Sequence, residues 1–279
     1  MRSAWKQLAR PIKETLKQRF PSLWLRWHLA RCAVEPELAL LKHIVPRDGV
    51  AVDIGANFGL YTRELARITD LVHAFEPSKP MAGILRRTSA ANVVIHEVAL
   101  SDRDGEACLR IPKGADGLVH SLASIEQNAA HIKEPCVSID VPLTRLDSVV
   151  RDNVKFVKID VEGHELKVLE GAIAVLERSH PIFLVEAEER HRAGAVTSIF
   201  RFFREHGYQG LFLKGDSVLG TEAFDAALLQ SKDSLRADGS RAPGRHYVNN
   251  FFFFPPPYDG RPLLLAGLQS LRSSRAAVN

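Results

Sequence analysis

The chain has 279 residues, of which 46% are hydrophobic and 25% are charged, a composition typical of one large globular domain with terminal extensions. Its three cysteines are widely spaced and form no CxxC pair, which argues against a disulfide framework or a thiolate zinc site and favours a reducing cytoplasm. The start has no uninterrupted apolar core with a cleavage site, and no apolar stretch is long enough to cross a bilayer. We therefore expect neither a signal peptide nor a membrane span.

Positive charge is concentrated in the first 34 residues, which hold eight Lys or Arg against one Glu. The formal net charge of the whole chain is +4, so the remainder is net acidic. Residues 1–35 are predicted to form a basic N-terminal helical arm. Two interpretations stay open: an apolar stripe of the arm packs on the main domain as a cap, or residues 1–34 contact an anionic membrane or an acidic substrate, with Trp24 and Trp27 as interfacial anchors.

From residue 50, short apolar runs alternate with stretches of helical period. The expected strands are "VAVDIG", "LVHAFEP", "VVIHEVALSD", "VKFVKIDVEG", "PIFLVEAEE", "YQGLFLKG" and "NNFFFFP". The expected helices include "NFGLYTRELARIT", "SKPMAGILRRTSA" with Ser78 as its cap, and "HELKVLEGAIAVLER". This alternation predicts βαβ units and an open, mostly parallel α/β sheet with helices on both faces. The domain is expected over 36–258, with an insertion or lid at 112–135 and a tail at 259–279 that has no clear period.

Two features of the first βαβ unit belong at the carboxyl edge of the sheet, where open α/β sheets bind ligands. Gly55 and Gly59 in "DIGANFG" let a ligand lie against the backbone, and Glu76 ends the next strand, where a carboxylate can accept hydrogen bonds from both ribose hydroxyls. Asp53 would repel a pyrophosphate, which opposes a nicotinamide-dependent oxidoreductase, and it suits a ligand with ammonium and sulfonium cations. S-adenosylmethionine has both cations and a ribose. The alternative is a tight turn in which Asp53 caps the helix.

A set of motifs in this order resembles the FkbM family of S-adenosylmethionine-dependent methyltransferases over about residues 36–257: "VDIGANFGLYT", "FEPS", "VALSD", "KIDVEGHELKVLEGA", "FLVEAEERH" and "NNFFFFP". The resemblance implies a seven-stranded class I, Rossmann-like methyltransferase sheet. It also implies O-methylation of a hydroxyl on a sugar, glycan, glycolipid or other natural product. By the same resemblance, the cofactor contacts fall on three groups of residues, with the methionine part beside Asp53, Gly55, Asn57 and Gly59, the ribose on Glu76, and the adenine beside Ala99, Leu100 and Asp102.

The densest group of polar residues is "KIDVEGHE", residues 158–165. Lys158, Asp160 and Glu162 would share one face of an extended chain, and His164 and Glu165 would open the following helix. Asp160 ends a strand beside the glycine loop, so it is our first candidate for the general base that takes a proton from the acceptor hydroxyl.

Two histidines are further candidates for the base, His191 before His164. The pKa of histidine, about 6.5, suits the task better than that of an ordinary carboxylate. Glu186 ends the strand "PIFLVEAEE" and is expected to orient the acceptor, whereas Glu188 is expected to face solvent.

Other functions fit the sequence less well. Asp160, Glu162 and Glu186 could bind Mg²⁺, but their spacing is not diagnostic, and no required metal is predicted. A non-catalytic module on a degenerate methyltransferase fold, which binds the cofactor or a membrane, is the alternative function. Nucleic acid is not expected as a partner, because the chain outside the arm is net acidic and lacks interleaved basic and aromatic residues around the site.

Overall fold

A computed structural model of the chain describes residues 35–276, except for 115–116, 127–128, 130–131, 133–134, 236–241 and 243–244. The predicted arm, apart from residue 35, therefore lies outside the described residues. Within the part that is described, no helix is both long and apolar enough to cross a membrane.

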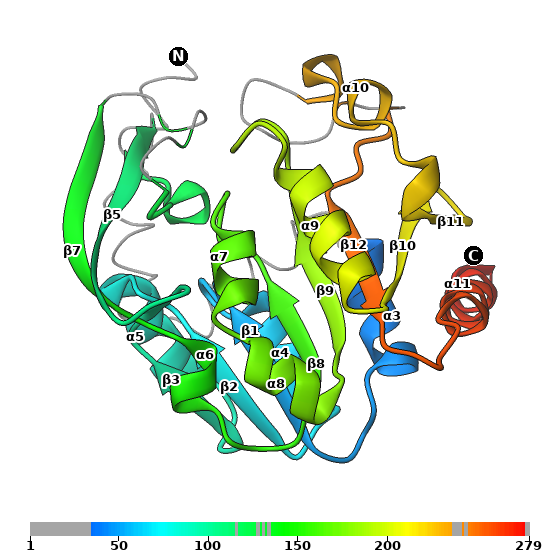
Figure 1. Cartoon of the computed structure of the whole chain (residues 1–279), viewed down its shortest axis with the longest axis horizontal. Coiled ribbons are helices and arrows are strands. Elements are labelled where there is room, and N and C mark those ends of the chain that lie inside the picture. Colours follow the sequence, from blue (N-terminus) through cyan, green and yellow to red (C-terminus); the bar gives the residue numbers. More distant parts are fainter. Residues whose placement is uncertain are drawn as a thin grey trace.

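One large sheet organises the molecule (Figure 1). Its strands, in chain order, are β1 (Val50–Ile54), β2 (Leu71–Phe75), β3 (Val93–His96), β8 (Val154–Ile159), β9 (Ile182–Glu186), β10 (Gln209–Lys214), β11 (Ser217–Gly220) and β12 (Asn250–Phe254). They lie side by side in the order β11-β10-β12-β9-β8-β1-β2-β3. The five neighbouring strands β9, β8, β1, β2 and β3 pair in parallel, and β12 runs antiparallel to both of its neighbours. The predicted mostly parallel, Rossmann-like sheet is confirmed.

The sheet has eight strands where seven were predicted. The additional strand is β11, which pairs antiparallel with β10 at the edge. The two strands are joined by the two residues between Lys214 and Ser217, and the first of them, Gly215, has φ +59. Tight two-residue hairpins need such left-handed backbone, which glycine adopts without strain.

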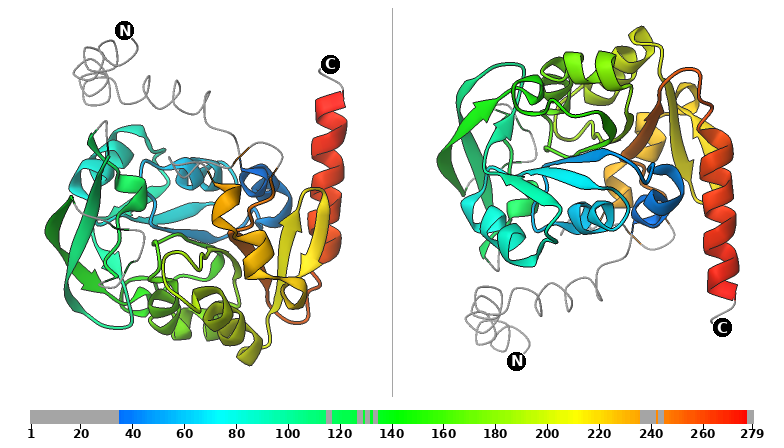
Figure 2. Two further views of the ribbon diagram at one scale, coloured as in Figure 1. Left: turned by 90° about the horizontal axis from the view of Figure 1, so that it is seen from above. Right: turned by 90° about the horizontal axis from the view of Figure 1, so that it is seen from below.

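Helices cover both faces of the sheet, as Figure 2 shows. One face is covered by α7 (Glu165–Glu170), α8 (Ile173–Ser179) and α9 (Ala195–Glu205), whose apolar side chains form one core cluster with alternate residues of the strands. The other face is covered by α3 (Pro36–Ile44), α4 (Leu60–Ala66), α5 (Lys79–Thr88) and α11 (Arg261–Ala276). Shorter elements are α6 (Leu146–Val149), α10 (Ala226–Leu229) and the 3₁₀ turns η1 (His120–Leu122), η2 (Thr221–Ala223) and η3 (Lys232–Ser234).

The single helix expected over "HELKVLEGAIAVLER" is instead two helices, α7 and α8, which separate at Gly171. A Cβ on Gly171 would lie 1.9 Å from the Ser101 carbonyl oxygen, so the chain is pressed against the backbone at Ser101. The Asp147 carboxylate then accepts hydrogen bonds from the N–H groups of Ala174 (3.1 Å) and Val175 (2.9 Å), which satisfies the first turn of α8.

The tail that showed no clear period forms α11, which packs against α3. Leu264 and Leu268 are buried in the same core cluster as Leu40 and Leu41, while Leu263 stays exposed. A run of three consecutive leucines hides the helical period, because only one side of the helix is buried.

A second sheet, in the order β4-β7-β5-β6, projects beyond β3 (Figure 1). Its strands are β4 (Ala99–Leu100), β5 (Gly105–Gly114), β6 (Gly117–Leu118) and β7 (Cys136–Thr144). The long antiparallel pair β5–β7 has its own small apolar core. We call the segment from β5 to β7, residues 105–144, the excursion. The predicted insertion at 112–135 runs from the last residues of β5 to the start of β7, and η1 lies within it.

We expect Gly171, between α7 and α8, and Gly83, within α5, to differ sharply on replacement by alanine. Gly171→Ala forces a backbone shift at Ser101 and should destabilise the fold by about 1–3 kcal/mol. Gly83→Ala, in α5, meets no atom within 4 Å and should stabilise it by roughly 0.5–1 kcal/mol. Urea unfolding of both variants measures the difference. Equal midpoints would contradict the tight contact at Gly171.

Candidate active site

The loop between β1 and α4 takes left-handed backbone at Gly55 (φ +79), Asn57 (φ +52) and Gly59 (φ +91). A Cβ on Gly55 would lie 1.8 Å from the Asp160 carbonyl oxygen, and the Asp160 N–H donates to the Ile54 carbonyl at 3.0 Å. The loop therefore lies directly on the end of β8, at a distance that glycine alone permits.

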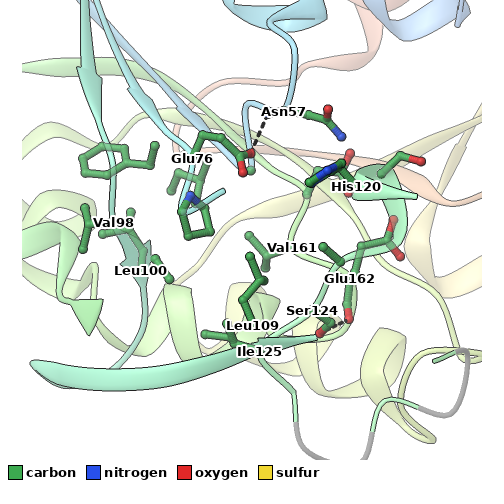
Figure 3. A pocket seen from close by; sticks show the side chains of 18 residues that line it. Asn57, Glu76, Val98, Leu100, Leu109, His120, Ser124, Ile125, Val161 and Glu162 are labelled. Carbon is green, nitrogen blue, oxygen red and sulfur yellow. Dashed lines mark hydrogen bonds between the residues drawn. The ribbon is translucent and has the colours of Figure 1, made fainter. Parts of the chain in front are cut away.

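Glu76, at the end of β2, is a buried carboxylate held by backbone donors (Figure 3). Its two oxygens accept hydrogen bonds from the N–H groups of Asn57 and Ser78, both at 2.8 Å. Burial raises the pKa of Glu76 to about 7. Each carboxylate oxygen has a second lone pair, so Glu76 can still accept hydrogen bonds from a ligand.

A pocket of about 680 Å³, including its open mouth, lies against these groups. Six residues predicted from the sequence line it: Gly55, Asn57, Glu76, Ala99, Leu100 and Asp160. The pocket joins the ends of β1, β2 and β8 with β4, which agrees with the predicted position at the carboxyl edge of the sheet.

Three of the predicted cofactor residues do not line the pocket. Asp53 is buried in β1 and accepts a short hydrogen bond from the Thr62 hydroxyl, and burial raises the pKa of its carboxyl. Gly59 precedes α4, where a Cβ would meet Leu85 at 2.7 Å. Asp102 is ion-paired with Lys167 at 2.9 Å, and that hydrogen bond lowers its pKa.

One wall of the pocket comes from the excursion between β5 and β7, within the segment expected as an insertion or lid, although none of its residues was a site candidate. The residues are His120, Ser121, Ala123, Ser124 and Ile125. Figure 3 shows His120 and Ser124 on the side of the pocket that faces Glu162.

Three hydrogen bonds fasten this wall to the main domain. His120 Nδ1 lies 3.0 Å from Ser78 Oγ, so the Ser78 hydroxyl, expected to cap α5, contacts the excursion instead. Ser124 Oγ donates to the Glu162 carbonyl at 2.8 Å.

The third hydrogen bond joins Glu126 Oε2 to His164 Nδ1 at 3.0 Å. The other ring nitrogen of His164 lies 2.9 Å from Ser101 Oγ, and burial lowers the pKa of the ring. His164 does not line the pocket, and both of its nitrogens are engaged.

The "KIDVEGHE" stretch does not continue as an extended chain, which corrects the expectation that Lys158, Asp160 and Glu162 share a face. β8 ends at Ile159, and Glu162 has φ +54, a conformation that is rare outside glycine and turns the chain. As a result the Glu162 carboxylate pairs with His191, with 2.9 Å between Oε2 and Nε2.

His191, the second base candidate, is 2% exposed and lies outside the lining of the pocket. Burial opposes its positive charge, but the hydrogen bond and the charge of Glu162 dominate and raise the pKa of His191. Of the three base candidates, Asp160 is the one that lines the pocket.

Asp160 and Glu186 stand on either side of a buried lysine that the sequence had not marked as functional. Lys158 Nζ is 3.9 Å from Asp160 Oδ2 and 3.9 Å from Glu186 Oε2. The side chains of Asp160 and Glu186 are 33% and 15% exposed, and that of Lys158 is 1% exposed. Asn249, just before β12, donates to Glu186 at 2.6 Å.

Burial sets the protonation of the two carboxyls. It raises the pKa of Asp160 to about 7, and it raises the pKa of Glu186 well above its ordinary value, where the neighbouring Asp160 adds to the effect. The positive charge of Lys158 acts in the opposite direction on both.

The expectation that Glu188 faces solvent is wrong, because its side chain is 1% exposed. It accepts hydrogen bonds from the Arg190 guanidinium, from the Tyr247 hydroxyl and, at 3.2 Å, from Asn249. Burial alone would raise the pKa of Glu188, but these donors lower it. The only sign of this pairing in the sequence is that Glu188 and Arg190 carry opposite charges and stand two residues apart.

The three carboxylates considered for Mg²⁺ point to different partners. Asp160 and Glu186 face Lys158, whereas Glu162 faces His191. Over the described part of the chain, no group of three or more His, Cys, Asp or Glu is arranged to hold a metal ion.

The chain belongs to the FkbM methyltransferase family, because the model of the methyltransferase FkbM domain matches residues 53–209, more than half of its length. This confirms the resemblance seen in the sequence. A protein of Beauveria bassiana described as Methyltransferase 1 is 26% identical over 147 residues, 45% of this chain and 59% of that protein. The chain thus matches about three fifths of this relative.

Two solved structures are similar to the chain. The crystal structure of methyltransferase FkbM from Methylobacillus flagellatus is 17% identical with a TM-score of 0.47, and the match covers 88% of this chain and 59% of that one. An rRNA methylase from Streptococcus thermophilus is 11% identical with a TM-score of 0.42, and the match covers 80% and 96% of the two chains.

We expect the Glu162–His191 pair to stabilise the fold in acid more than in alkali. The pKa of His191 is raised by folding, so its contribution is complete below the unfolded value of about 6.5 and disappears as the pH rises through the higher folded value. His191→Asn should therefore cost more at pH 6, on the order of 1.5–3 kcal/mol, than at pH 9. Urea unfolding at the two pH values measures this.

Glu162→Gln should reproduce that pH dependence, because it removes the charge that raises the pKa of His191. His180→Asn is the matched control, since His180 is exposed and has φ +46, which asparagine tolerates. A loss of stability for His191→Asn that is the same at both pH values would contradict the assignment.

Proposed function

We propose that the chain is an S-adenosylmethionine-dependent methyltransferase that methylates a hydroxyl group of a sugar, glycan, glycolipid or similar natural product. The observation that carries the proposal is that the glycine loop, Glu76 and Asp160 line the same pocket. Membership of the FkbM family supports the same activity.

The residues present fit the cofactor. Gly55 and Asn57 line the pocket, and Glu76 has lone pairs for two ribose hydroxyls. Leu100 and Val98 offer an apolar surface for an adenine ring. The carboxylates of Asp160 and Glu186, near the same edge, favour a cation. When bound, the cofactor supplies the transferable methyl group on a positively charged sulfur.

The acceptor is proposed to lie on the opposite side of Asp160 from the cofactor. The candidate is a second pocket of about 450 Å³, including its open mouth, which is lined by Pro36, Glu37, Leu213 and the segment 245–248. Glu35, which precedes this lining, acts on the pKa of both Asp160 and Glu186, and Asn249, which follows it, donates to Glu186. Residues next to this lining in the chain thus approach the carboxyl pair, which supports the proposal.

The chemical task of the chain is to align an acceptor oxygen with the methyl group and to take the hydroxyl proton. We propose Asp160 as the base, because a carboxyl with a pKa of about 7 is a better match for a proton from an alcohol than an ordinary carboxyl. Glu186, fixed by Asn249, would hydrogen-bond to the acceptor and orient it.

The cofactor assignment predicts ligand-dependent stabilisation. Wild type should gain about 2.7 kcal/mol at a concentration of S-adenosylmethionine or S-adenosylhomocysteine that is 100 times the dissociation constant, which raises the melting temperature by several degrees. Glu76→Ala and the milder Glu76→Gln should lose most of this gain, whereas Glu106→Ala, an exposed residue of β5, should keep it. No stabilisation of wild type by either compound would contradict the cofactor assignment.

The base assignment predicts a separation of binding from turnover. Asp160→Asn should still be stabilised by S-adenosylmethionine but should lose a factor of about 10²–10⁴ in turnover. In wild type, turnover should rise with pH through about 7, as Asp160 ionises. Transfer of a labelled methyl group to a panel of monosaccharides, glycans, glycolipids and RNA measures this, with the exposed Asp140→Asn as control. Transfer to RNA bases and to no hydroxyl compound would contradict O-methylation.

A further inference from the structure

Lys158 is a buried lysine in the central part of the sheet. It belongs to the central strand β8, its side chain is 1% exposed, and its Nζ lies 5.0 Å from the centre of the Tyr61 ring. Besides its two carboxylate neighbours, Nζ donates to the Ile159 carbonyl at 3.2 Å. Burying an ammonium group without compensating charges is costly, and a hydrophobic side chain of similar volume would fit a core strand better.

Carboxyl groups from several elements act on this ammonium or on its neighbour Asp160. The groups that act on Lys158 or on its neighbour Asp160 are Asp53 from β1, Glu76 from the end of β2, Glu186 from β9, Glu35 before α3, and Glu162 and Glu165 at the turn into α7. Burial works against the charged form of Lys158, but Asp160 and Glu186 outweigh it and raise its pKa. Lys158 therefore stays positive across the neutral range.

We propose that Lys158 is a positioning residue for methyl transfer: its buried ammonium keeps Asp160 ionised beside Glu186, so that Asp160 can receive the proton of the acceptor hydroxyl. This inference rests on the proposed function. It adds a role for a residue that does not itself line the pocket and that acts through Asp160.

The reaction shows why the charge matters. A bond forms between the acceptor oxygen and the methyl carbon, the bond between that carbon and sulfur breaks, and the sulfur keeps the electron pair and becomes neutral. The hydroxyl proton passes to Asp160, which becomes neutral as well. Two carboxylates so close together cannot both ionise easily. Without Lys158, Asp160 would already hold a proton at neutral pH and could not accept another.

A binding experiment tests this without knowledge of the acceptor. S-adenosylmethionine carries a positive sulfur, and S-adenosylhomocysteine does not. The ratio of their dissociation constants therefore reports the charge of the site. We would measure both constants by titration calorimetry from pH 5.5 to 9.5. In wild type, the preference for S-adenosylmethionine should grow with pH as Asp160 ionises, and Asp160→Asn should remove that transition.

Three lysine variants then identify the group that sets the transition. In Lys158→Met the midpoint should move upward by more than one pH unit, and at the alkaline limit the preference should exceed that of wild type, because a positive charge is gone. Lys158→Arg should keep the wild-type midpoint. Lys155→Met, on the same strand but outside this cluster, should leave both midpoint and preference unchanged.

The outcomes separate the two proposals. Binding of neither compound to wild type would overturn the proposed function. Binding of both, with the same midpoint in Lys158→Met as in wild type, would overturn the role of Lys158 alone. If Lys158→Met does not fold, nitrogen NMR of the Lys158 ammonium in wild type replaces it. A signal of the charged form from pH 6 to 9 is expected, and deprotonation within that range would overturn the inference.

Discussion

The site depends on one backbone contact, the approach of Gly55 to the carbonyl of Asp160. The two chains come so close that a single Cβ would collide with that oxygen, and the adjacent hydrogen bond from Asp160 to Ile54 fixes the register between the first strand and the strand that ends in Asp160. This contact turns the loop so that the Asn57 N–H reaches Glu76. The proposed ribose carboxylate and the proposed base thereby line the same pocket.

The electrostatics of the site follow from its position in the sheet. Parallel strands end at one edge, so the acids that terminate β8 and β9 meet there, beside the Glu76 carboxylate at the end of β2. Burial raises the pKa of these carboxyls and so favours their neutral forms. The ammonium of Lys158 lowers the pKa of Asp160 and Glu186 and so favours their ionised forms. The balance puts the pKa of Asp160 at about 7, near the pH at which a general base works best.

The parts of this structure that could be predicted are those governed by short-range patterns. The alternation of apolar runs with stretches of helical period, and the acidic residues at the ends of expected strands, were enough to predict the open sheet, the glycine loop and the positions of Glu76 and Asp160. Other features depend on contacts between residues distant in the chain. The break at Gly171 depends on Ser101, the burial of Glu188 depends on Tyr247, and the direction of Glu162 depends on a left-handed turn that ends the alternation. No local pattern carries that information.

The wall of the pocket that contains His120 and Ser124 comes from the chain between β6 and β7, where Ala123 and Ile125 pack on the apolar core of the second sheet. This wall therefore packs on an apolar core that is separate from those of the large sheet. Hydrogen bonds of His120, Ser124 and Glu126 attach it to the main domain. A change in the second sheet can thus alter one wall of the pocket while the glycine loop, Glu76 and Asp160 keep their geometry.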